Sequence, residues 1–210
     1  MLAFAYPKVR HQRNQVPGHR ANYSDYKPYL QIEFDRRCVY CRAPDPLKGY
    51  ANFGVDHYRP KSRFELLATE YLNLYYCCND CNRRKGSHWP SAEEEAIHFV
   101  PNPCEHVMFQ HLRAGKDGKV EARTPAGEFT VELLHLNDDL TVNFRMAAMQ
   151  AIELLRNEEA KALRLNSTIE RRRKAGTVSV AKAEADTAAV TKQLLRTRSS
   201  LAVFCELPEP

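Results

Sequence analysis

The amino-acid sequence predicts an α+β protein, with a small strand–strand–helix core stapled by four cysteines and a C-terminal helical region. Three observations support this. Two Cys-x2-Cys pairs bracket two short apolar stretches: Cys38/Cys41 and Cys78/Cys81. The second stretch runs directly into a helix-like segment, Asn79 to Gly86. From Phe129 onward, apolar residues recur with a helical period.

Bulk composition suggests a globular protein with an anionic partner. The chain has 210 residues and a formal charge of +5, enough length for one domain or one small domain plus an extension. Residues 1–63 hold twelve Lys/Arg against five Asp/Glu, and such a local excess favours nucleic acid as the partner. Pro7 cuts short the apolar run that starts at Met1, so we expect neither a signal peptide nor a membrane span, and a cytoplasmic location.

Composition and periodicity divide the chain into four segments. Residues 1–24 form a basic arm without apolar period, and residues 25–100 form the core with the cysteines. Residues 101–128 are a loop and hairpin connection, and residues 129–205 are the helical region.

Local signals place the elements of the core. A short helix is expected from about Ser24, which could cap it. Residues 43–52, with two prolines and a glycine, predict a loop. Residues 53–58 predict a strand that Pro60 ends, and residues 72–78 predict a second strand.

The rest of the chain predicts a hairpin and long helices. Residues 115–118, Gly-Lys-Asp-Gly, indicate a turn between segments 109–112 and 119–122. A long amphipathic helix follows, for which Asn137 or Asp138 could serve as the cap. Gly176 interrupts the helical pattern, and a final helix covers about residues 180–201.

The two cysteine pairs predict one structural zinc site. A Cys-x2-Cys turn presents two thiolates to one ion, and two turns complete a tetrahedron. The pairs are separated by 36 residues, so folded structure should lie between them. The x2 spacing selects Cys78 and leaves Cys77 facing the other way along the strand. Cys77, Cys104 and Cys205 are expected to be buried apolar residues.

The segment between and after these pairs carries three ordered motifs, which make five signatures together with the two Cys-x2-Cys knuckles. Asp56-His57-Tyr58-Arg59-Pro60-Lys61-Ser62 is followed by Asn73-Leu74 and then by Cys81-Asn82-Arg83-Arg84-Lys85-Gly86. In this order, bracketed by two zinc knuckles, residues 36–90 closely resemble the HNH, or ββα-metal, endonucleases. The resemblance implies a divalent-metal-dependent phosphodiester hydrolase that acts on DNA.

Phosphodiester hydrolysis needs an activated water and stabilisation of the charged phosphate. An imidazole can take a proton near neutral pH, so His57 fits the general base. The resemblance assigns Asp56 and Asn82 as the oxygen ligands of Mg2+ or Mn2+, and Asn73 as a structural residue that pins the loop between the strands. Because Asp56 and His57 are neighbours, both can serve one site only if the strand twists or ends there.

Basic residues around the motif are candidates for phosphate contacts. These candidates are Arg59, Lys61, Arg83, Arg84 and Lys85. The arm offers a second group: Arg10, His11, Arg13, His19 and Arg20. Residues 171–174 form a basic run, which is usually a solvated helix face.

A looser resemblance extends beyond the core. Residues 99–104, the Asp117-Gly118 turn and residues 130–137 are similar to small bacterial HNH proteins, some of which resemble the nuclease component of Septu-type and retron-linked anti-phage systems. That resemblance implies an ATPase partner. Two alternatives stay open: a zinc-stapled nucleic-acid-binding module with a dispensable catalytic site, and an RNA-cleaving nuclease.

Overall fold

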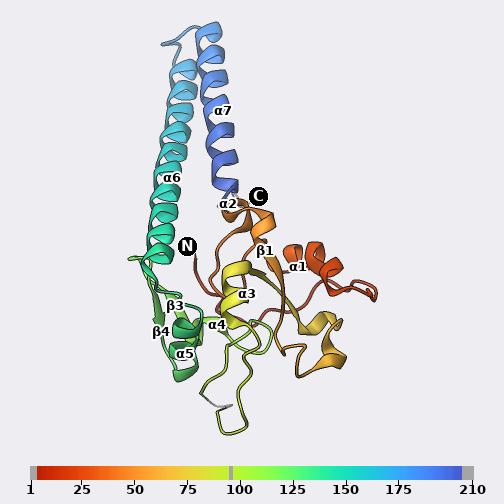
Figure 1. Cartoon of the computed structure of the whole chain (residues 1–210). Helices are drawn as coiled ribbons and strands as arrows, with labels where there is room; N and C mark the ends of the chain where they lie inside the picture. The colour runs from red at the N-terminus through yellow and green to blue at the C-terminus, as the bar shows by residue number, and fades with distance from the viewer. Residues whose placement is uncertain (1–3, 95–96, 205–210) are drawn as a thin grey trace. The chain divides into compact units, whose positions relative to one another are not determined.

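The structure is a computed structural model that describes residues 4–94 and 97–204 (Figure 1). The chain divides into two compact units, Met1–Met146 and Ala147–Pro210. The division falls inside the long helix α6, Asp139–Lys174, and not near Phe129, where the helical period begins.

The centre of the first unit is an antiparallel hairpin followed by a helix. Strand β1 (Phe53–His57) pairs with β2 (Leu74–Cys78), so that Phe53 lies opposite Cys78 and His57 opposite Leu74. Every residue of β2 is buried, which explains its unbroken apolar sequence. Helix α3 (Asn79–Lys85) begins directly after β2. The predicted strand–strand–helix core is therefore confirmed.

A short helical segment precedes this core. A 3-10 turn, η1 (Tyr23–Tyr26), leads into α1 (Lys27–Glu33). The expected cap was wrong: Asn22 Oδ1 accepts a 3.0 Å hydrogen bond from the Ser24 backbone, so Ser24 lies in the first turn. After α1, the Phe34 ring stacks on Tyr75 of β2 at 5.5 Å between centroids.

The N-terminal segment has no regular structure but is tied to the core. The Tyr6 hydroxyl donates to the Tyr40 carbonyl at 2.8 Å. The Arg13 guanidinium lies over three aromatic rings and donates to the Leu74 carbonyl at 2.8 Å. Buried Glu33 accepts from His11 and from two backbone N–H groups of the arm. His11 and Arg13, expected to be candidates for phosphate contacts, are therefore engaged within the protein.

Short helices fill the connections that the sequence left as loops. Helix α2 (Asp45–Lys48) and turn η2 (Tyr50–Asn52) lie in the segment expected to be loop. Asp45 in this segment is fully buried and accepts a 2.7 Å hydrogen bond from the Tyr76 hydroxyl. Turns η3 (Glu65–Leu67) and η4 (Tyr71–Asn73) connect β1 to β2.

The second hairpin forms where the turn signal predicted it. Helix α4 (Met108–His111) precedes β3 (Leu112–Ala114), which pairs with β4 (Val120–Ala122). Gly118 has φ +77°, and a Cβ there would meet the Val142 carbonyl at 2.9 Å. Only glycine fits that turn without displacement.

Helix α5 (Pro125–Leu133) begins four residues before the predicted start at Phe129. The Thr124 hydroxyl accepts from the Gly127 N–H, and Pro125 occupies the first helical position, so the capping chemistry sets the start. Asn137 is not free to cap α6, because its amide bonds both the N–H and the carbonyl of Val120.

The second unit contains the rest of α6 and helix α7 (Val180–Ala202), two long antiparallel helices in Figure 1. Ser179 caps α7, and Gly176, with φ +67°, lies between the helices as the sequence indicated. Four buried residues form the core of the pair: Ala162, Ile169, Ala183 and Val190. Among the described residues, no helix combines the length and apolar character needed to cross a bilayer.

Candidate active site and metal centre

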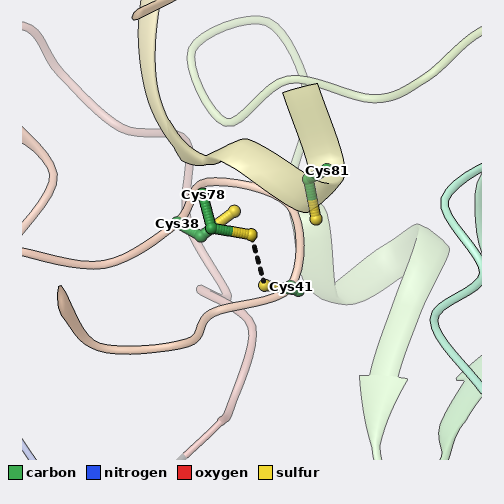
Figure 2. A group of neighbouring side chains, drawn as sticks. All are labelled: Cys38, Cys41, Cys78 and Cys81. Carbon is green, nitrogen blue, oxygen red and sulfur yellow. Dashed lines mark hydrogen bonds between the residues drawn. The ribbon is translucent and has the colours of Figure 1, made fainter. Parts of the chain in front are cut away.

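Four cysteine sulfurs converge at the junction of β2 and α3 (Figure 2). Cys38, Cys41, Cys78 and Cys81 are all buried, and their sulfurs lie within 4.8 Å of one another, with 3.7 Å between Cys41 and Cys78. Sulfurs around a tetrahedral zinc with bonds of about 2.3 Å lie about 3.8 Å apart. The cluster therefore fits the zinc site expected from the spacing.

The surroundings of the cluster suit an anionic four-thiolate site. Hydrogen bonds with the neighbouring thiols lower the pKa of Cys41 well below its ordinary value. Burial opposes a charge on Lys48, but nearby Cys78 and Cys41 and the carboxylate of Asp80 outweigh it and raise the Lys48 pKa. A positive charge beside the thiolates offsets part of the negative charge that four of them carry around one Zn2+.

Cys77 lies outside the four-sulfur cluster. It is fully buried, and burial together with the nearby Asp56 charge raises the pKa of its thiol. Cys77 thus belongs to the side of β2 that faces the nuclease motif. Cys104 is half-buried, and Cys205 lies outside the described residues.

A cleft of about 360 Å³ brings the motif residues together. Asp56 and His57 from the end of β1 line it with Asn82 from α3. The strand ends at His57, so the neighbours need not point to opposite faces of a continuing sheet. Both reach the same cleft, which resolves the geometric difficulty that their adjacency posed.

Asp56 is almost fully enclosed in the cleft, at 2% exposure. Its Oδ2 accepts from the Tyr40 hydroxyl at 2.5 Å, and its Oδ1 accepts from Lys85 Nζ at 3.0 Å. An ionised carboxylate has about four lone-pair sites. Two hydrogen bonds leave acceptor capacity on both oxygens, so Asp56 can still ligate a cation.

His57 is held with one ring nitrogen committed. Its Nε2 lies 2.9 Å from the Ala68 carbonyl, which can only accept, so Nε2 carries the proton and the neutral ring keeps its lone pair on Nδ1. The Tyr23 ring packs edge-on against the imidazole at 4.6 Å. Burial lowers the His57 pKa, outweighing the Ala68 hydrogen bond and the Asp56 charge, which raise it. Burial therefore favours the neutral imidazole, the form that can act as a base.

The two asparagines of the motif have different surroundings. Asn82 Nδ2 donates to the Val55 carbonyl at 3.4 Å, which leaves its Oδ1 as the acceptor in the cleft. Asn73 is buried and bonds both the N–H and the carbonyl of Arg59, at 2.9 and 3.0 Å. Its Nδ2 also donates to the Leu67 carbonyl, so this side chain holds the β1–β2 connection from two sides.

The five basic candidates fall into two groups. Lys61 lines the cleft, and Arg59 and Arg83 are exposed. Arg84 instead bonds the Leu134 and His135 carbonyls and Asp138, which ties α3 to the segment after α5. Lys85 is buried and bonds Asp56 and the His57 carbonyl. The expected phosphate contacts of Arg84 and Lys85 thus conflict with their positions, since both side chains are committed within the protein.

Three contributors to the site had no signal in the sequence. Tyr40 lies between the first two zinc cysteines, yet its hydroxyl reaches Asp56. Tyr23 comes from η1 and covers His57. Ser87 follows α3 and lines the cleft. A tyrosine inside a zinc knuckle is indistinguishable from ordinary core packing until the fold is known.

A two-stranded hairpin and a helix that bring an Asp-His pair and an asparagine into one cleft, beside a four-thiolate cluster, define a ββα nuclease core. Comparison with known proteins agrees: residues 38–88 match the family model of the HNH endonucleases. Those residues are an HNH domain.

Two curated relatives extend the likeness beyond this domain. The chain is 32% identical to "Septu protein PtuB" of Bacillus thuringiensis over 154 residues, 68% of the chain and 56% of that protein. It is 22% identical to "Septu protein PtuA" of Bacillus mycoides (strain KBAB4) over 140 residues, 56% of the chain and 20% of that protein. The chain therefore spans about half of the first relative's length and a fifth of the second's.

Proposed function

We propose that this protein is a metal-dependent HNH endonuclease that hydrolyses phosphodiester bonds in DNA. The observation that carries the proposal is the position of His57 in the cleft, with Nε2 committed to the Ala68 carbonyl and Nδ1 left as the base. In that state, Nδ1 can accept the proton of an attacking water.

The other cleft residues supply the remaining parts. Asp56 and Asn82 would hold Mg2+ or Mn2+ through oxygen atoms, the ligands that hard cations prefer. A bound divalent cation would stabilise charge on the phosphate and on the leaving oxygen. Tyr40 and Lys85 orient the Asp56 carboxylate, and Lys61 at the cleft offers a positive charge to the phosphate backbone. The four cysteines would hold a separate, structural zinc.

The Septu relatives support a biological setting. We propose that the chain is the nuclease of a Septu-type anti-phage system and works with an ATPase partner, as its sequence resemblance implies. A cytoplasmic location is part of this proposal, because a reducing compartment keeps four thiols free for zinc.

The test is plasmid cleavage by the purified protein with Mg2+ or Mn2+, compared with the His57→Ala variant. The wild type should cut, and the variant should lose at least 100-fold in rate, about the contribution expected of a general base. Zinc content and melting temperature should match between the two proteins, since the His57 side chain bonds Ala68 and supplies no ligand to the cysteine cluster. Equal cleavage by both proteins would remove His57 from the mechanism, and DNA binding without cleavage would favour the binding-module alternative.

A further inference from the structure

A second, smaller pocket lies beside the cleft and has a different character. It has a volume of about 140 Å³, and six of its residues carry the argument: Tyr58, Arg59, Trp89, Phe99, Glu105 and His106. Four of these are aromatic or heteroaromatic rings, whereas the cleft has two such rings, Tyr23 and His57, among its ten lining residues. The HNH motif accounts for the cleft but gives this pocket no role.

Two chain segments connect the pocket directly to the cleft. His57 lines the cleft, and Tyr58 and Arg59, which follow it, line the pocket. Ser87 lines the cleft, and Trp89, two residues later, lines the pocket. Two residues of extended chain span at most about 7 Å. The backbone that lines the pocket therefore lies within about 7 Å of the backbone that lines the cleft in both segments.

The pocket combines aromatic surface with polar groups. The Arg59 guanidinium lies 5.3 Å from the Trp89 ring centroid, and the Tyr58 ring meets Trp89 edge-on at 5.5 Å. The Phe99 ring is tilted against His106 at 4.9 Å. His106 Nδ1 accepts from the Asn102 N–H, so its Nε2 carries the donor proton, and Glu105 adds an acceptor. Aromatic rings, an arginine plane and a few hydrogen-bonding groups are what proteins use to bind unstacked bases.

We propose that this pocket binds a single unstacked nucleobase next to the phosphate that is cut. The inference rests on the proposed nuclease function and narrows its substrate to nucleic acid that is single-stranded or locally opened at the cleavage site. A base in a continuous duplex is stacked on both faces and cannot enter without being turned out of the helix.

The experiment uses Trp89, the only tryptophan of the chain, as a fluorescent reporter in the full-length His57→Ala protein. The probes are a 12-nucleotide DNA strand, the same strand in a blunt duplex, and an abasic strand with the same number of phosphates. We expect saturable quenching by the strand with bases and little change with the abasic strand or the duplex. Equal quenching by the abasic strand, or no quenching by any probe, would overturn the proposal.

A matched pair of variants separates base binding from phosphate binding. Phe99→Leu removes a pocket ring and should weaken single-strand binding about tenfold while changing abasic-strand binding less than twofold. Phe109→Leu replaces an equally half-buried ring outside the pocket and should bind as the parent does. If both variants bind strands like the parent, the pocket does not hold a base. If the wild type cleaves but the His57→Ala protein shows no base-dependent quenching, the base-binding proposal is wrong and the nuclease proposal stands. If base-dependent quenching occurs but the wild type does not cleave, the nuclease proposal is wrong.

Discussion

The cysteine cluster lies where β2 passes into α3, and the nuclease cleft lies between the end of β1 and the same helix. Four identical donors form the cluster, all buried and all within 4.8 Å. The cleft holds a carboxylate, an imidazole and an amide, each already bonded to the protein: Asp56 to Tyr40 and Lys85, His57 to Ala68, Asn82 to Val55.

This difference indicates what each site needs in order to form. Four thiolates at such distances repel one another unless a cation lies between them. The cleft residues are held by hydrogen bonds that need no metal. The cluster should therefore depend on its ion for folding, whereas the cleft should be preorganised before any metal or substrate arrives.

Removing a zinc ligand should have the largest effect. Cys81→Ser should lower zinc content from about one per chain and unfold the first unit, because structural zinc supplies about 10–16 kcal/mol in small sites, comparable to the stability of a whole domain. Elemental analysis and thermal melting followed by circular dichroism measure both effects. Cys77→Ala, which alters the adjacent cysteine outside the cluster, should keep its zinc. A Cys81→Ser protein that melts like the wild type would show that the cluster is dispensable.

Breaking the ion pair beneath the cleft should come next. Lys85→Met leaves the Asp56 carboxylate buried without its cation, and both side chains are at most 2% exposed. Losing one partner of such a pair costs about 3–5 kcal/mol, measurable by urea unfolding of the zinc-loaded protein. Arg83→Met, two residues earlier on α3, disrupts an exposed pair with Asp80 and should cost about 1 kcal/mol or less. Equal, small losses would mean that the cleft is not held by Lys85.

The sequence predicted the parts of both sites that are local in the chain. Cys-x2-Cys turns, the Asp-His pair ending a strand and the start of α3 depend on near neighbours, and the structure has them where expected. The spacing of α3 could not show which of its basic side chains faces inward, because this depends on where β1 packs. Lys85 therefore looked like a phosphate contact although it lies beneath Asp56.

Long-range partners account for the other differences. The three groups that hold Arg84 lie 50 to 54 residues along the chain. The N-terminal arm looked exposed because it has no apolar period, yet Arg13 is held by aromatic rings near residues 34 and 71–75. Neither contact leaves a periodic trace in the sequence, so composition alone suggested free basic surface.

The pH dependence of cleavage should show how far burial lowers the pKa of His57. A general base acts when neutral, so the rate should rise with pH and level off above the His57 pKa, which burial lowers from its ordinary value of about 6.5. Tyr23→Ala uncovers the ring, so it should raise the pKa and move the inflection to higher pH. The variant should be slower than the wild type at pH 6 and similar at pH 8, as measured by initial plasmid-cleavage rates. Tyr29 is a half-buried tyrosine of α1 that contacts Arg20, so Tyr29→Ala should leave the pH profile unchanged. If the inflection stays at the wild-type pH in Tyr23→Ala, burial by Tyr23 does not set the pKa of His57.

The smallest expected effect concerns Lys61, whose charge lies at the cleft with its Nζ 4.9 Å from the Tyr23 ring centroid. Each phosphate contact releases condensed counterions, so losing one lowers the slope of log affinity against log salt by about 1 without changing sequence preference. Lys61→Ala should show this loss in binding titrations from low to moderate salt. Because Lys61 also lowers the His57 pKa, the binding comparison should be made in the His57→Ala background, where that coupling is absent.

The matched control is Lys116→Ala, which removes the same charge from an exposed lysine in the β3–β4 turn, away from the cleft. It should keep the parental salt slope. Equal slopes for both variants would mean that Lys61 contributes only to the general electrostatic field of the protein.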